Sequence, residues 1–451
     1  MTFPRYSIYK DSGVTWLGGI PAHWDIKKFR YVFEESPEKI TDEVVGEMLS
    51  VSGYRGIEVK HYDDEGRRRT DDELFGYRVV RPGQLVVNTM WLNYAGLGVS
   101  DYEGHVSPAY RSYWIDSAMD KRFTHHLMRS GTYVQGYTQL LTGIRPNSLQ
   151  MGRDDLMVFP VLLPARVEQT QIARFLDHET ARIDALIEEQ QRLIELLKEK
   201  RQAVISHAVT KGLDPTVPMK DSGVEWLGEV PAHWKQIRIK HILNAMIDAE
   251  HKTAEYSDDG EYLVCRTTNV RNGLLSLEGA KYADRNTYID WTRRGVPEPL
   301  DILFTREAPA GEACLVPENL EICLGQRMVL FKLDKTRIDP AFTVHSIYAG
   351  LASDFVKQLS QGSTVSHFNM ADIGNIPLFE PPLPEQKEIS DFLARRCDSY
   401  GLLINEAESS VKLISERRSA LISAAVTGKI DVRGWQPPAS APTPELVQEA
   451  V

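Results

Sequence analysis

A chain of 451 residues with 42% hydrophobic and 25% charged side chains has the composition of a globular protein of about three domains. Its apolar runs are much shorter than the roughly 20 residues of a membrane-spanning helix, and its first residues lack the apolar core of a secretory signal. Its four cysteines form no CxxC pair, which argues against a zinc site and a disulfide framework. These features predict a cytoplasmic protein without a membrane partner.

The net charge of −11 disfavours nucleic acid as a partner, because nucleic-acid-binding surfaces are usually basic. The charge is unevenly distributed, however. Residues 78–153 contain eight Lys and Arg against four Asp and Glu, and residues 262–294 contain six against three. Local basic faces on an acidic protein are therefore expected, and they leave nucleic acid open as a partner.

Two internal repeats show that the chain is a tandem duplication. Residues 10–24 (KDSGVTWLGGIPAHW) and 220–234 (KDSGVEWLGEVPAHW) are identical at 12 of 15 positions; we call this repeat the PAHW motif. Residues 168–214 and 385–431 align without gaps and share 18 of 47 residues; we call the segments around them arms 1 and 2. The predicted boundaries are domain 1 with its PAHW motif at 1–164, arm 1 at 165–217, domain 2 with its PAHW motif at 218–384, arm 2 at 385–435, and a Pro- and Ala-rich disordered tail at 436–451.

The two arms are predicted to be long helices, because apolar residues recur on one heptad a/d track in each. In arm 1 the track contains Ile172, Leu176, Ile183, Leu186, Leu193, Leu197 and Val204. In arm 2 it contains Ile389, Leu393, Tyr400, Leu403, Ala407, Ile414 and Leu421. Pro164 and Pro384 lie near the helix starts, and Gly212 and Gly428 follow the ends. We expect an antiparallel coiled coil; the alternative is two unrelated amphipathic core helices.

The two domains share little sequence but have the same rhythm of short β-branched runs, turns and a helix-like stretch. The predicted strands are 85–88, 110–115, 262–267, 302–305 and 328–333, and the helix-like stretches are 123–133 and 341–359. This pattern predicts mixed α+β domains. In the PAHW motifs, Trp16, Trp24, Trp226 and Trp234 are predicted to be apolar anchors between each domain and the arms.

No catalytic motif is visible in the chain. There is no GxxxxGK[ST] phosphate loop, Gly96-Leu-Gly98 is followed by Asp101 where a dinucleotide fingerprint needs glycine, and no His lies in an HExxH motif. We therefore expect no catalytic, cofactor-binding or metal-binding residue in this chain. An enzyme whose acid and base residues leave no local signature remains an alternative.

Candidate DNA contacts are polar or basic residues at strand ends and in two glycine turns. The turns, 143–148 (GIRPNS) and 362–367 (GSTVSH), close the two domains; Arg and Asn there could contact phosphates or base edges, although an ordinary capped turn is an alternative. The candidates are Asn88, Tyr110, Arg111, Arg145, Asn147, Ser148, Thr305, Arg306, Gln326, Arg327, Ser363, Thr364 and Ser366.

The order and duplication of these motifs resemble the specificity (S) subunit of type I restriction–modification systems. The resemblance covers nearly the whole chain apart from the tail. Its motifs are the WLG…PAHW repeats at 16–24 and 226–234, GHVSPAY at 104–110, FTREAPAGE at 304–312, GSTVSHF at 362–368, PPLPEQKEI at 381–389, and the arm ends AVTKG and AVTGK. The GIRPNS turn departs from the GST-like turn that is frequent in the family.

The resemblance implies two mixed α/β target recognition domains separated by two long antiparallel coiled-coil helices with pseudo-two-fold symmetry. Each domain would bind one half of a bipartite, asymmetric double-stranded DNA site, and the arms would set the gap and dock two methyltransferase (M) subunits. Restriction (R) subunits would complete the complex. S-adenosylmethionine would belong to M, and ATP and Mg would belong to R, so this chain would be non-catalytic. A coiled-coil scaffold protein without DNA binding is the alternative.

Overall fold

The computed structural model describes residues 3–53, 55–62, 69–143, 149–223, 227–250, 252–349, 352, 354–355, 357 and 368–438. The chain divides into two compact units: unit 1 contains Met1–Gln191 and Ser409–Val451, and unit 2 contains Arg192–Glu408. The helix α4 (Arg166–Lys211) and the helix α9 (Leu383–Val426) each contribute one part to each unit. Residues 439–451 of the predicted disordered tail lie outside the described residues.

Domain 1 in unit 1 contains two four-stranded sheets. The first has the antiparallel order β4 (Phe33–Glu35), β11 (Arg111–Ile115), β8 (Leu85–Val87), β9 (Leu97–Val99). The second has the order β6 (Gly56–Val59), β5 (Glu47–Ser52), β10 (Gly104–Val106), β7 (Arg78–Val80), with β5 and β10 parallel. Three helices follow: α1 (Lys121–Arg129), α2 (Gly131–Thr138) and α3 (Arg153–Val158). All three residues of strand β8 are buried, as its uninterrupted Leu-Val-Val run predicts.

Domain 2 in unit 2 repeats this strand pairing. Its main sheet has the order β16 (Leu243–Asp248), β24 (Met328–Leu333), β21 (Ile302–Thr305), β22 (Ala313–Leu315). Its second sheet has the order β20 (Tyr282–Ala283), β17 (Tyr262–Cys265), β23 (Ile322–Leu324), with β17 and β23 parallel. Among its described residues, domain 2 also contains β18 (Val270–Arg271), β19 (Leu274–Leu275), α5 (Arg285–Trp291), α6 (Pro340–Ile347) and α8 (Met370–Gly374). The α+β prediction is therefore confirmed for both domains.

Each unit also contains a short two-stranded sheet at the PAHW motif and another that pairs the strand after this motif with the strand before the arm. In unit 1 these are β1 (Tyr9–Asp11) with β2 (Gly19–Pro21), and β3 (Asp25–Lys28) with β12 (Pro160–Leu163). In unit 2 they are β13 (Met219–Asp221) with β14 (Glu229–Pro231), and β15 (Lys235–Arg238) with β25 (Pro377–Glu380). In the part of the chain that the structure describes, single 3₁₀ turns lie at Phe29–Tyr31, Asp71–Leu74, Leu92–Tyr94, Ile239–His241 and Thr267–Asn269.

The helix-like stretch predicted at 123–133 is two helices rather than one. Ser130 has extended backbone angles (φ −62°, ψ 148°), so α1 ends there. The Ser130 hydroxyl then accepts a hydrogen bond from Tyr133 N and caps α2. A serine that satisfies a free backbone N–H in this way favours a new helix start over continuation of the old helix.

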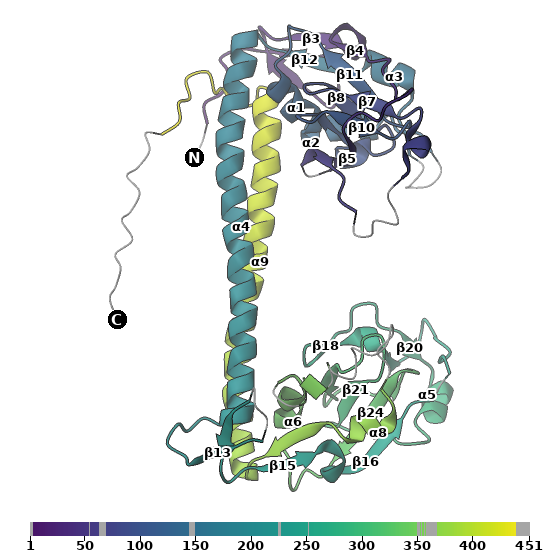
Figure 1. Cartoon of the computed structure of the whole chain (residues 1–451), viewed down its shortest axis with the longest axis vertical. Helices are drawn as coiled ribbons and strands as arrows, with labels where there is room; N and C mark the ends of the chain where they lie inside the picture. Colours follow the sequence, from purple (N-terminus) through teal and green to yellow (C-terminus); the bar gives the residue numbers. More distant parts are fainter. Residues whose placement is uncertain are drawn as a thin grey trace. The chain divides into compact units, whose positions relative to one another are not determined.

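The arms form long helices that pair antiparallel within each unit (Figure 1). In unit 1, Ile172 and Leu176 near the start of α4 share a hydrophobic cluster with Ala425 and Val426 at the end of α9. In unit 2, the cluster joins residues late in α4, such as Ile205 and Val209, to Ile389 and Leu393 early in α9. The predicted antiparallel pairing is confirmed.

The predicted seam is correct at most positions and wrong at three. Leu186, Leu193 and Leu403 are exposed rather than buried. Their neighbours Ile187, Ile194 and Ile404 are buried instead. An α-helix drifts by about 20° per heptad relative to an exact 3.5-residue repeat, so a strict heptad track moves off the contact line along a long helix. Within the described residues, no helix has the combination of length and apolarity that a bilayer crossing requires.

Candidate nucleic-acid interface

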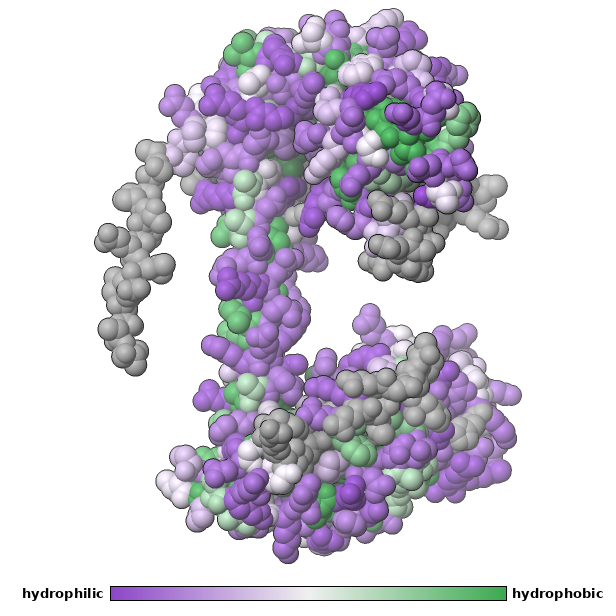
Figure 2. All heavy atoms as spheres, viewed as in Figure 1, coloured by the Kyte–Doolittle hydropathy of each residue, from purple (hydrophilic) through white to green (hydrophobic). Residues whose placement is uncertain are grey.

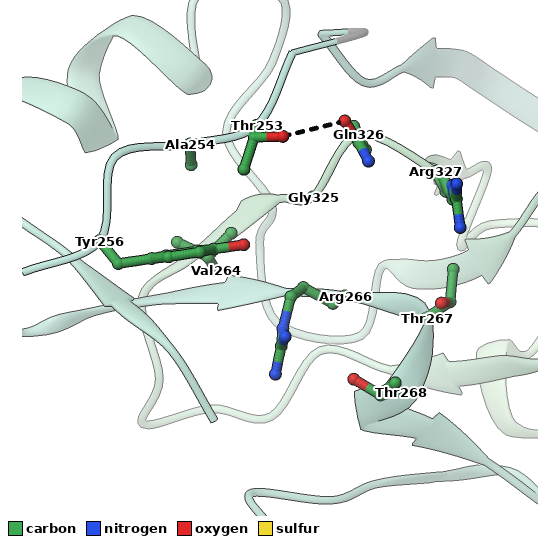
Figure 3. A pocket seen from close by; sticks show the side chains of 10 residues that line it. All are labelled: Thr253, Ala254, Tyr256, Val264, Arg266, Thr267, Thr268, Gly325, Gln326 and Arg327. Atoms are coloured by element: carbon green, nitrogen blue, oxygen red, sulfur yellow. Dashed lines mark hydrogen bonds between the residues drawn. The ribbon is translucent and has the colours of Figure 1, made fainter. Parts of the chain in front are cut away.

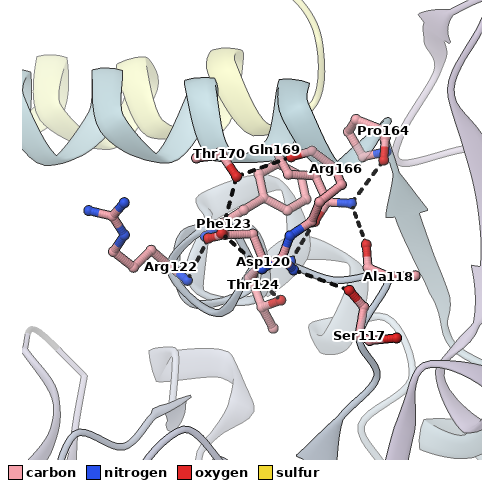
Figure 4. Close-up of polar contacts among 10 residues, drawn as sticks. All are labelled: Ser117, Ala118, Asp120, Arg122, Phe123, Thr124, Pro164, Arg166, Gln169 and Thr170. Carbon is pink, nitrogen blue, oxygen red and sulfur yellow. Dashed lines mark hydrogen bonds and ion pairs between the residues drawn. The ribbon is translucent and has the colours of Figure 1, made fainter.

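Each domain is joined to its arm by a glutamine at an equivalent position, Gln169 in unit 1 and Gln386 in unit 2. Gln169 at the start of α4 accepts a hydrogen bond from Asp120 N at 2.7 Å and donates to the carbonyl oxygens of Ala118 and Pro164 (Figure 4). The Asp120 side chain in turn caps α1 by accepting from Arg122 N and Phe123 N. The arm and the first helix of the domain are therefore fixed to one another through buried hydrogen bonds.

Unit 2 has the same junction. Gln386 accepts from Asp339 N at 2.7 Å and donates to the carbonyl oxygens of Arg337 and Pro381. Asp339 caps α6 by accepting from Phe342 N. The repetition of this contact in two dissimilar domains explains why the Glu-Gln pair is shared by both arms.

The PAHW motifs hold the glutamate that precedes each of these glutamines. In unit 1, Glu168 accepts hydrogen bonds from Tyr6 Oη at 2.6 Å and Trp24 Nε1 at 3.0 Å, and His23 Nε2 lies 2.9 Å from its second oxygen. Burial and the adjacent Glu168 carboxylate raise the pKa of Tyr6 well above its usual range. Trp24 is wholly buried, so its predicted anchoring role is confirmed.

In unit 2, Glu385 accepts from Trp234 Nε1 at 3.0 Å and lies 2.8 Å from His233 Nε2. Trp234 is also wholly buried. Trp16 stacks on Phe159 in unit 1, whereas Trp226 lies outside the described residues. Lysines at the arm ends complete the contact: Lys429 donates to the Leu17 and Gly19 carbonyl oxygens in unit 1. Lys211 donates to the Leu227 and Glu229 carbonyl oxygens in unit 2.

The strand pairing places the predicted strand-end residues at one equivalent sheet edge in both domains. Arg111 at the start of β11 pairs with Val87 at the end of β8. Met328 at the start of β24 pairs with Thr305 at the end of β21. The opposite ends of β11 and β24 lead toward Asp120 and Asp339, which contact the arms. We call the end of the main sheet where β8 ends and β11 begins the distal edge of domain 1. The distal edge of domain 2 is the corresponding end of its main sheet, where β21 ends and β24 begins.

At the distal edge of domain 1, the three described candidates lie together. Asn88 is buried and its side chain accepts from Met90 N at 3.2 Å. Burial raises the pKa of Tyr110, and a hydrogen bond with the Asn88 side chain partly offsets this. Arg111 forms an ion pair with Glu35 at 2.6 Å. Burial opposes ionisation of Glu35, but its hydrogen bonds with Arg111 and Arg153 outweigh this and hold its pKa below the usual value.

At the distal edge of domain 2, Thr305 is buried and its hydroxyl accepts from Glu312 N at 2.9 Å. Arg306 follows it and forms an ion pair with Asp248 at 2.6 Å. Arg306 N also donates to Arg327 O, so this edge brings Arg306 beside Gln326 and Arg327. These placements show which candidates meet; their contact with DNA stays a prediction.

The glycine-turn candidates Arg145, Asn147, Ser148, Ser363, Thr364 and Ser366 lie outside the described residues. The described residues that follow the two turns return to the distal edges. Met151 N donates to Thr89 O in domain 1, and Phe368 N donates to Arg306 O in domain 2, each at 3.1 Å.

A pocket of about 260 Å³ opens at the distal edge of domain 2 (Figure 3). It combines the predicted Gln326 and Arg327 with residues that the sequence analysis did not single out. Its lining residues are Thr253, Ala254, Tyr256, Val264, Arg266, Thr267, Thr268, Gly325, Gln326 and Arg327. The local excess of basic residues at 262–294 was the only sequence signal that pointed to Arg266. The lining contains two guanidinium groups and no carboxylate, which suits a negatively charged ligand.

The chain thus contains two dissimilar domains with the same strand pairing, and each domain is fixed to a long helix by the same type of junction. Comparisons with known proteins show which proteins have sequences and folds similar to this chain. The model of the type I restriction modification DNA specificity domain matches residues 231–403. The type I restriction enzyme MjaVIII specificity subunit of Methanocaldococcus jannaschii is 25% identical over 279 residues, which cover 60% of this chain and 62% of that protein.

The type I restriction enzyme EcoBI specificity subunit of Escherichia coli is 22% identical over 339 residues, which cover 73% of this chain and 68% of that protein. A solved structure described as the structural basis of complex assembly and conformational transition of the type I R-M system has a TM-score of 0.67 at 14% identity. It covers 91% of this chain and 99% of that chain, which shows a shared fold. In sequence and in fold, this chain is similar to the specificity subunits of type I restriction–modification systems.

Proposed function

We propose that this chain gives a type I restriction–modification complex its DNA sequence specificity, with each domain binding one half of a bipartite, asymmetric site. The observation that carries the proposal is the distal edge. Two domains with the same strand pairing place different polar and basic side chains at the same edge. A common backbone with different edge residues is what two different half-sites require.

Two domains are needed because one domain discriminates poorly. Each base pair contributes about 1–3 kcal/mol, so a few base pairs cannot select one site in a genome. Joining two domains makes the second contact effectively intramolecular, which raises both affinity and selectivity. In this proposal the paired helices act as the spacer that sets the gap between the half-sites.

The chain itself performs no chemistry in this proposal. Methyltransferase subunits bind S-adenosylmethionine, and restriction subunits bind ATP and Mg. Recognition residues here hold the DNA in register for those partners. This division of labour is supported by the lack of a catalytic motif in the sequence.

A domain exchange tests the proposal. The strand pair β3–β12 brings the two ends of domain 1 together, and Phe29 N donates to Phe159 O at 2.8 Å just inside it. Replacing residues 29–159 by the matching segment of another family member should change one half-site and leave the other half-site and the gap unchanged. Sequencing of DNA selected by the complex from a randomised library measures this. Selection of no sequence by the unaltered complex would favour the scaffold alternative.

We also propose that the paired helices dock the methyltransferase subunits. Large apolar side chains are exposed along them among hydrophilic ones (Figure 2). The leucines among them are Leu186, Leu193 and Leu196 on α4, and Leu402, Leu403 and Leu413 on α9. Exposed leucines on a helix pair are typical of a surface that a partner covers.

Polar substitution tests this docking. Leu402→Gln together with Leu413→Gln should reduce co-purification of the methyltransferase subunit by about tenfold or more and make the isolated chain more soluble. Leu274→Gln is the matched control, because Leu274 is a leucine of similar exposure outside the helices, and it should change neither. Unchanged co-purification of the double variant would contradict the proposed docking surface.

A further inference from the structure

The pocket at the distal edge of domain 2 is built from segments that are far apart in the sequence. Thr253 lies in the segment before β17, Arg266 directly follows β17, and Gln326 lies in the turn between β23 and β24. The parallel pairing of β17 with β23 brings these ends together, since Cys265 pairs with Leu324. The pocket therefore has a fixed backbone frame, with Arg306 N bonded to Arg327 O beside it.

The Gln326 amide in this pocket is oriented by a neighbour. Thr253 Oγ1 donates a hydrogen bond to Gln326 Oε1 at 3.3 Å, and Figure 3 shows the two side chains meeting on one side of the pocket. An amide oxygen has two lone pairs, so Oε1 can accept a second hydrogen bond while the Nε2 group donates. Among the described contacts, the Thr253 bond is the one made by this side chain, and Gln326 is exposed. The amide thus presents a donor and an acceptor side by side.

Part of the pocket lining is apolar. Ala254 and Val264 both line the pocket and are buried in the domain. Arg266 also lines it and donates to Gly279 O at 2.6 Å, which orients its guanidinium group. Arg327 lies 3.8 Å from Glu307 and is about half exposed, so it can still reach a phosphate.

Because glutamine presents a donor beside an acceptor, its complement in the DNA major groove is adenine, which offers an N6 donor beside the N7 acceptor. The thymine of the same pair projects a methyl group, which requires an apolar contact. We propose that this pocket recognises one A·T base pair, with Gln326 contacting the adenine edge and Ala254 and Val264 receiving the thymine methyl group. This inference rests on the proposed function and names the base pair class for one position of one half-site.

The test compares DNA selection by the full chain, isolated with its co-purifying subunits, before and after Gln326→Leu. Sequencing of selected DNA should show loss of preference by about fivefold to a hundredfold at one position of one half-site, where the unaltered complex selects A·T. Gln326→Glu should move the preference at that position toward cytosine, since glutamate accepts from the cytosine N4 amino group. Uracil in place of the paired thymine should weaken binding of the unaltered complex by a few-fold.

Thr253 provides a finer test of the same contact. Thr253→Val removes the hydroxyl that orients Gln326 and should relax the same position by a few-fold, whereas Thr253→Ser keeps the hydroxyl and should retain the preference. Gln236→Leu is the matched control, because Gln236 is an exposed glutamine on β15 outside the pocket. It should leave every position unchanged.

Three results would overturn the inference. In the first, Gln326→Leu relaxes no position. In the second, it weakens all positions uniformly. In the third, it relaxes a G·C position. In each of these results the unaltered complex still selects a bipartite site, so the proposed function stands. Selection of no sequence by the unaltered complex would instead contradict the proposed function itself.

Discussion

The two domains share a backbone plan but differ in the side chains at its distal edge. Strands β4, β11, β8 and β9 correspond in pairing to β16, β24, β21 and β22, and each domain has one parallel strand pair in its second sheet. At the edge, domain 1 has the buried Asn88 beside the half-buried Tyr110, whereas domain 2 has a pocket lined by Gln326 and Arg266. The same strand pairing therefore tolerates extensive sequence change, because backbone groups supply the hydrogen bonds between strands.

The segments that follow β8 and β21 differ as well. In domain 1, Trp91 and Tyr94 are 54% and 61% exposed, and their rings lie 5.9 Å apart. In domain 2 the corresponding segment contains Glu307 and Pro309 and no aromatic residue. Two such different edges on one backbone suit an asymmetric site better than a palindromic one.

The junctions differ in how deeply the repeated glutamate is buried, and this predicts the largest stability difference between the units. The Glu168 side chain is 7% exposed and contacts Tyr6, Trp24 and His23. The Glu385 side chain is 26% exposed, and its contacts within the described residues are with His233 and Trp234. Glu168→Ala leaves two buried donors unpaired and should destabilise unit 1 by about 3–5 kcal/mol. Glu385→Ala should destabilise unit 2 by about 1–2 kcal/mol.

Denaturant unfolding combined with hydrogen exchange in residues 6–24 and 220–234 would resolve the two units. Glu195→Ala is the control, because Glu195 is exposed and pairs with Lys198 across one helical turn. It should change the free energy of unfolding by less than about 0.5 kcal/mol. Equal losses of stability for Glu168→Ala and Glu385→Ala would show that the deeper burial of Glu168 does not set the size of the effect.

Acid should destabilise unit 1 through His125. Burial, together with the positive charge of Arg129, lowers the pKa of His125 to about 3, and its Nδ1 accepts from Val99 N. The unfolded chain binds a proton at this histidine below about pH 6.5 while the folded unit does not, so stability falls as the pH drops from about 6.5 toward 3. At pH 5 the loss relative to pH 7 is about 2 kcal/mol.

His125→Asn tests this assignment, because asparagine can accept the Val99 hydrogen bond without titrating. The free energy of unfolding of unit 1 should then lose most of its dependence on pH between 7 and 5. Burial also lowers the pKa of His345 in unit 2, where the nearby Asp339 partly opposes the shift. Because His345 lies in unit 2 and His125 in unit 1, His125→Asn should leave the pH dependence of the free energy of unfolding of unit 2 unchanged.

The smallest effect is expected at an ion pair between the helices of unit 1. Arg418 donates to both oxygens of Asp184 at 2.7 and 3.0 Å, and both side chains are partly exposed. Burial, reinforced by the charge of Arg418, lowers the pKa of Arg129 to about 10. Arg418→Ala removes both the attraction between Arg418 and Asp184 and the repulsion between Arg418 and Arg129. These two effects oppose one another, so the free energy of unfolding should change by less than about 1 kcal/mol. A loss above about 2 kcal/mol in thermal or denaturant unfolding would show that this pair matters more than its exposure suggests.

The arms and many strands were predictable because their signals are local. The apolar spacing predicted both long helices, and the β-branched runs predicted β8, β11, β17, β21 and β24 within one or two residues. The seam register was harder, since Leu186 and Ile187 are adjacent and both apolar, and only the packing of the partner helix selects Ile187. The same holds for Leu403 and Ile404.

The sequence by itself determined that the chain is a duplication, that its arms are helical and that its two PAHW motifs anchor equivalent junctions, because repeats and periodicity are written along the chain. Only the tertiary structure decided which side chains share a distal edge. Thr253, Arg266 and Gln326 meet through the parallel pairing of β17 with β23 and the strand order of two sheets. Such pairings join residues distant in the sequence, and their choice depends on the burial of whole sheets, which no local pattern records.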